Sequence, residues 1–110
     1  MSRLGRFLDA MRARGLFAAL IHGRENIRYL TGYTGEGWLF VSEGARAILT
    51  DFRYVEQVGL QAPDLECART RTGKTVEQLV AELFKRSDAD KLAVETNVMS
   101  YDEFQALSKE

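Results

Sequence analysis

The sequence predicts an α/β domain built on a mixed, mostly parallel sheet of about five strands, with helices on both faces. Several segments carry apolar residues at three- and four-residue spacing, as on one face of a helix, and short apolar runs between them indicate buried strands. Because the two kinds of segment alternate, we expect parallel strands joined by helices, with one antiparallel hairpin. The length of 110 residues suits one domain and is too short for a second complete core.

The chain is expected to begin with a helix, a strand and a second helix. The apolar face of the first helix comprises Leu4, Phe7, Leu8 and Met11. Gly15 after this face is typical of a left-handed C-cap. The apolar run Phe17 to Ile21 is too short for a helix and predicts a buried strand. Residues 24–31 predict a short helix that ends at Gly32.

A glycine-rich loop and a hairpin form the middle of the chain. The loop covers Thr31 to Gly37 and contains three glycines. Strands are predicted over Trp38 to Val41 and Arg46 to Thr50, and Glu43-Gly44 between them favours a tight turn.

Helices and strands alternate again after the hairpin. Asp51 is placed to cap a helix that runs to about Val58, and residues 65–70 alternate as in a strand. Thr75 and Gln78 form a capping box ahead of a helix. The apolar face of that helix comprises Val76, Leu79, Val80, Leu83 and Phe84.

The C-terminal residues predict a last strand and a last helix. Leu92 to Val94 favours the strand, and a second capping box, formed by Ser100 and Glu103, begins the helix. The chain stops at Glu110 inside this helix without a C-cap signal. We therefore expect the domain to be truncated at its C-terminal end.

Composition excludes several classes of protein. Hydrophobic residues make up 45% and charged residues 28% of the chain, an ordinary globular mixture. A net charge of −1 argues against a dedicated nucleic-acid binder, and no apolar run approaches the ~20 residues that span a membrane. The lone Cys67 and the absence of a signal peptide predict a cytoplasmic protein.

Neither glycine-containing segment matches a nucleotide-binding motif. Gly73-Lys74-Thr75 lies between a strand and a helix, but a phosphate-binding loop needs glycine five positions earlier, where the sequence has Ala68. The glycines of residues 32–37 leave a helix and enter a strand, the reverse of the dinucleotide-binding order. These residues instead suggest a mobile loop, whose glycines allow the backbone to approach a ligand or to act as a hinge. Of the flanking aromatic residues, Trp38 favours the core, whereas Tyr33 fits a core anchor and a contact surface equally well.

No catalytic or metal-binding constellation is found in the sequence. With one histidine, His22, and one cysteine, Cys67, the chain cannot assemble a zinc site. His22 favours a structural role at a strand end, and Cys67 favours a small apolar side chain in a strand. We therefore assign no catalytic residue and no metal ligand to this chain.

The segment Asp51-Phe52-Arg53-Tyr54 joins a strand to a helix and allows two interpretations. In the first, Arg53 pairs with Asp51 and Tyr54 packs against the core, so that the segment only stabilises the turn. In the second, the guanidinium of Arg53 contacts an anion or a peptide carboxylate.

Three pieces of residues 26–57 belong together: NIRYLTGY at 26–33, the aromatic strand after the glycine-rich loop, and Thr50-Asp51-Phe52-Arg53-Tyr54. The opening helix, Gly15-Leu16 and the apolar run Phe17 to Ile21 precede them. With these pieces, nearly the whole chain, and most specifically residues 26–57, resembles the N-terminal domain of the creatinase/prolidase family, especially that of bacterial Xaa-Pro peptidases (Xaa-Pro dipeptidase and aminopeptidase P). The resemblance implies that residues 1–110 form this domain and that a catalytic domain of pita-bread fold is absent from the chain.

The resemblance also implies a parent enzyme that cleaves before proline with two divalent ions (Mn, Co or Zn), which activate a bridging water. The ligands of the family, two Asp, one His and two Glu, lie in the catalytic domain and match no position here. The chain alone is therefore expected to hold no cofactor and to be inactive.

Partners and a candidate site follow from the same resemblance. The parent is expected to be a homodimer in which this domain contacts its own catalytic domain, helps form the subunit interface and borders the entrance for a proline-containing peptide. Tyr33, Trp38, Arg53 and Tyr54 are the entrance candidates, although local capping already explains Arg53 and Tyr54. Two alternatives remain. One is the N-terminal domain of a creatinase-type amidinohydrolase or of a relative that binds peptide without cleaving it, and the other is a standalone binding module.

Overall fold

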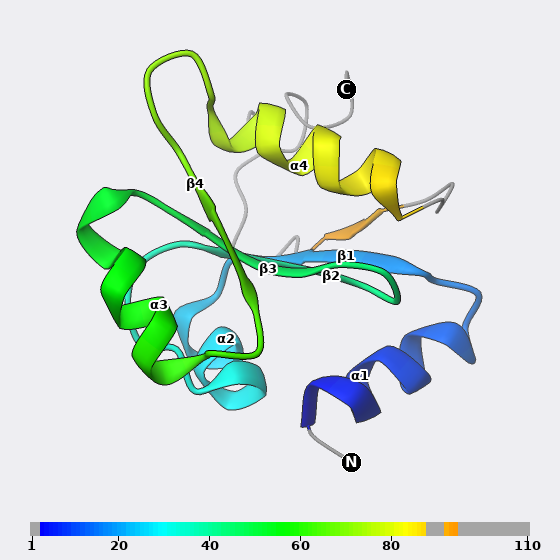
Figure 1. Cartoon of the computed structure of the whole chain (residues 1–110). Coiled ribbons are helices and arrows are strands. Elements are labelled where there is room, and N and C mark those ends of the chain that lie inside the picture. The colour runs from blue at the N-terminus through cyan, green and yellow to red at the C-terminus, as the bar shows by residue number, and fades with distance from the viewer. Residues whose placement is uncertain (1–2, 88–91, 95–110) are drawn as a thin grey trace.

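A computed structural model describes residues 3–87 and 92–94 (Figure 1). The elements, in chain order, are α1 (Arg3–Arg12), β1 (Ala18–Ile21), α2 (Arg24–Thr31), β2 (Trp38–Ser42), β3 (Arg46–Thr50), the 3₁₀ turn η1 (Phe52–Tyr54), α3 (Val55–Gln61), β4 (Glu66–Arg69), α4 (Val76–Arg86) and β5 (Ala93–Val94). This succession confirms the predicted alternation. The helix expected after Ser100 lies outside the described residues.

The strands form one mixed sheet in the order β4-β3-β2-β1-β5, in which β5 has only two residues. The mixed sheet is confirmed, but the expectation that it is mostly parallel is wrong. β1 pairs with β2 and β2 with β3 antiparallel, whereas β3–β4 and β1–β5 are parallel. The reason is that α2 is not a crossover helix. Ile21 at the end of β1 lies opposite Leu39 near the start of β2, so the chain returns at the end where it left.

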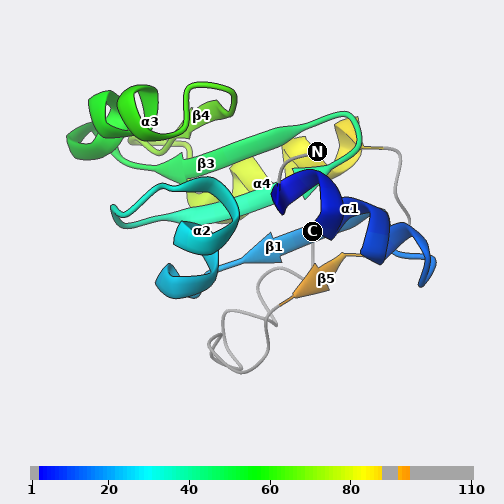
Figure 2. The same cartoon turned by 90° about the horizontal axis from the view of Figure 1, so that it is seen from below.

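Helices cover both faces of this sheet, as predicted. α1, α2 and α3 lie on one face and α4 lies on the other (Figures 1 and 2). Alternate strand residues therefore belong to two cores. The core under α1–α3 includes Leu8, Ile21, Ile27, Leu39, Ile48 and Val58. The core under α4 includes Leu20, Phe40, Leu49, Val80 and Leu83.

The predicted helix ends and turns are confirmed in detail. Gly15 has a φ of 75°, and the N–H of Leu16 after it donates to the carbonyl of Met11 at 2.9 Å. Gly32 has a φ of 86° and closes α2 in the left-handed conformation. The capping box of Thr75 with Gln78 is formed, with both reciprocal hydrogen bonds.

Phe17 departs from the prediction of a buried strand residue. β1 begins at Ala18, whose partner Ser42 forms the last pair of the ladder. Phe17 therefore lies beyond the paired strand and remains 43% exposed.

Candidate functional site

The ends of four strands lie side by side at one end of the sheet. β1, β3 and β4 finish there and β2 begins there, because Ile21 pairs with Leu39, and Thr50 pairs with Arg69. A hollow of about 290 Å³ opens at these strand ends, and we call it the strand-end pocket. It is lined by His22, Arg24, Glu36, Gly37, Trp38, Leu49, Thr50, Asp51, Thr70 and Val76.

One wall of the pocket is an aromatic stack. The rings of His22 and Trp38 lie 3.8 Å apart between centroids and are tilted by only 4°. Trp38 is half-buried and also packs against the core under α4. Sequence reasoning placed both residues at strand ends but not together. The signal that could have joined them is the antiparallel register of β1 and β2, in which His22 and Trp38 form the next pair beyond Ile21–Leu39.

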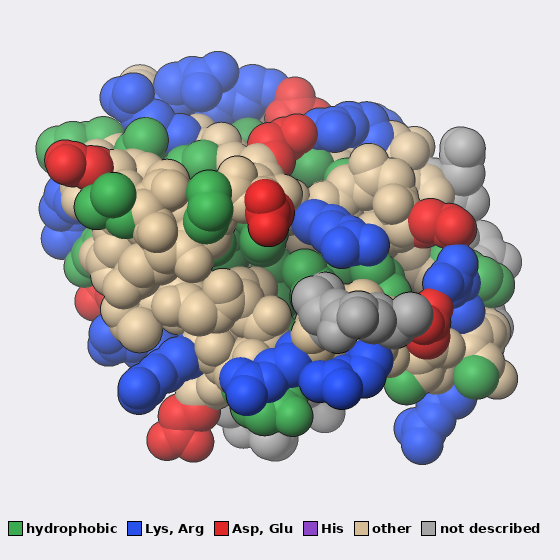
Figure 3. Space-filling model, turned by 60° about the horizontal axis from the view of Figure 1, so that its bottom comes forward, with side chains coloured by type: hydrophobic (Ala, Val, Ile, Leu, Met, Phe, Trp, Pro, Cys, Tyr) green, Lys and Arg blue, Asp and Glu red, His purple; other side chains and the backbone are tan. Residues whose placement is uncertain are grey.

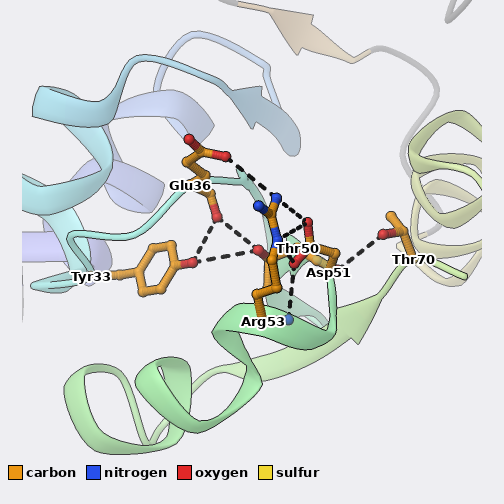
Figure 4. A network of polar contacts seen from close by, with 6 residues as sticks. All are labelled: Tyr33, Glu36, Thr50, Asp51, Arg53 and Thr70. Carbon is orange, nitrogen blue, oxygen red and sulfur yellow. Dashed lines mark hydrogen bonds and ion pairs between the residues drawn. The ribbon is translucent and has the colours of Figure 1, made fainter.

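The glycine-rich loop is fastened beneath the pocket by a buried tyrosine. Tyr33 is 1% exposed, and its hydroxyl donates to the carbonyl of Glu36 at 2.6 Å (Figure 4). The hydroxyl of Thr50 donates to the same carbonyl at 2.8 Å. Burial raises the pKa of Tyr33 above its ordinary value, so its hydroxyl stays protonated as a donor. Of the two roles left open for Tyr33, the structure supports the core anchor.

Two glycines of this loop are required by close packing. A Cβ on Gly35 would lie 2.5 Å from the hydroxyl oxygen of Tyr33 and 2.9 Å from the ring of Tyr54. Gly37 has a φ of 147°, and a Cβ there would lie 2.5 Å from the carbonyl oxygen of Leu49. The loop backbone is therefore held between two aromatic rings and a strand, and each position excludes a larger residue.

Arg53 and Asp51 form the bracing pair that the sequence suggested. Arg53 Nη2 lies 2.7 Å from Asp51 Oδ2, and the backbone N–H of Arg53 donates to Asp51 Oδ1 at 3.0 Å. The guanidinium also lies 3.8 Å from Glu36 and 5.3 Å from the ring centroid of Tyr54. Hydrogen bonding from Arg53 lowers the pKa of the Asp51 carboxyl. Arg53 is thus engaged by two carboxylates and a ring.

α3 holds the same loop from the other side. The amide of Gln57 donates to Thr34 Oγ1 at 3.0 Å, and the backbone N–H of Thr34 donates to Gln61 Oε1 at 2.9 Å. Arg24 Nη2 donates to the carbonyl of Thr34 at 2.9 Å. Sequence reasoning missed both glutamines, and their four-residue spacing on one helix face was the available signal.

The four entrance candidates occupy different positions. Trp38 lines the strand-end pocket, whereas Tyr33 lies buried below the loop. Arg53 and Tyr54 lie beside the pocket on η1, and their side chains brace the loop.

The described residues do not fit a metal centre or a reactive thiol. Within residues 3–87 and 92–94, no three His, Cys, Asp or Glu side chains are grouped so as to hold a metal ion. The pocket carboxylates Glu36 and Asp51 are both paired with Arg53. Burial raises the pKa of the Cys67 thiol, which disfavours its reactive thiolate form. No helix in the described part of the chain is long and apolar enough to cross a membrane.

These features define a class of domain: a mixed α/β unit with a braced glycine-rich loop at one sheet edge. Residues 3–110 match the Creatinase/Prolidase N-terminal domain, and the chain therefore belongs to this family. The match confirms the resemblance and covers almost the entire chain.

Solved structures support this assignment. The N-terminal domain of the cytoplasmic peptidase PepQ from Mycobacterium tuberculosis H37Rv is 35% identical, with a TM-score of 0.85 over 97% of this chain and 82% of that chain. The Xaa-Pro dipeptidase from Bacillus anthracis is 27% identical, with a TM-score of 0.87 over 97% of this chain and 30% of that chain.

A curated relative is the uncharacterized peptidase YqhT from Bacillus subtilis (strain 168). It is 34% identical over 95 residues, which cover 86% of this chain and 26% of the relative. The chain thus spans about a quarter of the length of that relative.

Proposed function

We propose that this chain is the non-catalytic N-terminal domain of a cytoplasmic Xaa-Pro peptidase. The observation that carries the proposal is the similarity in sequence and fold to peptidase N-terminal domains, at 35% identity for PepQ. The two divalent ions (Mn, Co or Zn) would be bound by a catalytic domain outside this chain, because the described residues offer no ligand cluster. The domain contributes to a homodimer and to the substrate entrance.

In this proposal, the loop from Tyr33 to Trp38 borders the entrance. Tyr33 anchors the loop from below, and Arg53 and Tyr54 brace its side. Trp38 is the candidate that reaches the pocket, where the part of its half-buried ring that remains accessible offers an apolar surface to a peptide. Arg53 acts on substrate only indirectly, because Asp51 and Glu36 already engage its guanidinium.

The first experiment is to sequence the gene past the codon for Glu110. The 110-residue chain and the longer protein that the gene encodes are then assayed for hydrolysis of Xaa-Pro peptides. The 110-residue chain should not hydrolyse Xaa-Pro peptides with added manganese, cobalt or zinc. A longer product that contains the two Asp, one His and two Glu ligands should hydrolyse them. Turnover by the pure 110-residue chain, or hydrolysis of creatine in place of peptide by the longer product, would contradict the proposal.

A matched pair of variants tests the entrance role in the longer product. Trp38→Ala should raise KM for Xaa-Pro peptides with little change in kcat, because it removes a binding surface and no reacting group. Phe17→Ala is the control, since Phe17 is an aromatic residue with an exposed ring that precedes β1, at the end of that strand opposite the pocket. Equal KM values for the two variants would remove Trp38 from the entrance.

A further inference from the structure

Three of the five large hydrophobic side chains that are exposed among the described residues lie on α3 and on the turn η1 directly before it. Phe52 is 70% exposed, Leu60 is 76% exposed and Val55 is 39% exposed. Within α3, Val55 and Gly59 are four residues apart, as are Glu56 and Leu60, so the four lie on one side of the helix. Phe52 precedes them in η1. We call these five residues the outer α3 face. Hydrophobic side chains reach the surface over this helix in Figure 3.

At Gly59, in the centre of this face, neither the backbone conformation nor a neighbouring atom of the described residues requires a glycine. Its φ lies outside the left-handed region, and a Cβ there would meet no atom within 4 Å. Glycine inside a helix is less favourable than alanine by about 1 kcal/mol. Isolated exposed apolar residues are common on proteins. A helical glycine that its own domain does not require, placed next to exposed apolar side chains, indicates instead that another surface approaches the helix backbone closely.

The size of the face points to a covalently attached occupant. An aromatic side chain such as Phe52 offers about 150–250 Å², and the two smaller aliphatic side chains beside it leave the face well short of the about 800 Å² that a stable complex between free proteins buries on each partner. A tethered partner needs less contact area, because the tether supplies a high effective concentration. Two of the relatives extend well beyond this domain, because it covers only 30% of the B. anthracis dipeptidase and 26% of YqhT.

We propose that the outer α3 face docks an apolar surface of the catalytic domain in the same polypeptide. This inference rests on the proposed function for the identity of that domain. The opposite side of α3 holds the glycine-rich loop through Gln57 and Gln61. Docking of α3 therefore positions the entrance loop relative to the catalytic domain.

Hydrogen exchange tests this docking directly. The amides of residues 55–61 should exchange at least ~10-fold more slowly in the longer gene product than in the 110-residue chain, because docking suppresses local opening of α3. Phe52→Ser and Gly59→Ala should each abolish that difference. Gly59→Ala should at the same time slow exchange in the 110-residue chain, because alanine favours the helix. Tyr29→Ser, at a 61% exposed position on α2, is the control and should leave the difference intact.

Three results would overturn the proposal. They are equal exchange in the two proteins, a reading frame that stops at Glu110, and self-association of the 110-residue chain that Phe52→Ser abolishes. The last result would assign the face to a second copy. Exchange reports docking whether or not the longer protein cleaves Xaa-Pro peptides, so failure of docking and failure of the proposed activity are observed separately.

Discussion

Replacing Gly35 with alanine should destabilise the domain through a steric conflict in the loop. The added Cβ would lie 2.5 Å from the hydroxyl oxygen of Tyr33, 2.7 Å from its Cζ and 2.9 Å from Cδ1 of Tyr54. These distances are too short for carbon contacts, so a ring or the loop must move. Tyr33 is 1% exposed and is held by the carbonyl of Glu36, so its ring has little room.

The magnitude follows from three contributions. Overpacking of a well-packed site costs about 1–3 kcal/mol, and weakening the Tyr33–Glu36 hydrogen bond costs about 1 kcal/mol. The alanine reduces the entropy of the unfolded chain, which offsets about 0.4–1 kcal/mol. We expect a net loss of about 2 kcal/mol in the free energy of unfolding, and each kcal/mol lowers Tm by about 4–8 °C in a domain of this size.

Urea unfolding followed by Trp38 fluorescence measures this loss. Gly44→Ala is the matched control, because a Cβ on Gly44 meets no atom within 4 Å, and it should change stability by less than about 0.5 kcal/mol. Gly35→Ala introduced into Tyr33→Phe should cost less than it does alone, since the closest conflict is with the hydroxyl. If Gly35→Ala behaves like Gly44→Ala, the packing argument for this loop is refuted.

Three further predictions concern single interactions. Tyr33→Phe should cost about 1 kcal/mol in urea unfolding. Because burial raises the folded pKa of Tyr33 above its ordinary value of 10.0, the wild type should lose stability as pH rises through the folded pKa, and this variant should lose less. Asp51→Asn should flatten the acid side of the stability profile. Hydrogen bonding from Arg53 lowers the folded pKa of Asp51, so the contribution of Asp51 is present above its ordinary pKa of 3.8 and is lost as pH falls through the folded pKa. Thr75→Ala should cost about 1 kcal/mol by removing the N-cap of α4, measured by thermal unfolding, and an unchanged Tm would contradict the role of the capping box.

Local signals predicted the elements, and pairing partners decided the topology. Gly15, Gly32 and the Thr75–Gln78 box act within a few residues of their positions, so the sequence alone located those helix ends. The direction of β2 depends on the end of β1 beside which β2 begins, and residues 22–37 between the two strands decide this. An eight-residue helix followed by a glycine-rich loop is compatible with either end of the sheet. Periodicity carries no information on that choice, and the parallel prediction failed there.

In the candidate site, too, contacts within one segment could be predicted and contacts between different elements could not. The pairing of Arg53 with Asp51 spans two residues and was predictable. The stack of His22 on Trp38 and the bond between Thr50 and the carbonyl of Glu36 join residues from different elements. These contacts exist only once the register of the sheet is set. Thr50 ends a strand and looked ordinary in sequence, although it is buried and holds the loop.

The glycines of the loop restrain its backbone, although glycines usually make a loop flexible. Gly35 and Gly37 allow the backbone to pass within contact distance of Tyr33, Tyr54 and β3, where any side chain would collide. Hydrogen bonds from Tyr33 and Thr50 then hold that backbone on one side, and α3 holds it on the other. Trp38 follows directly after this restrained segment, so its ring is held in place before any ligand arrives. A binding surface that is already ordered loses little entropy on binding. In the entrance role that we propose, the loop therefore acts as a fixed surface and not as a moving lid.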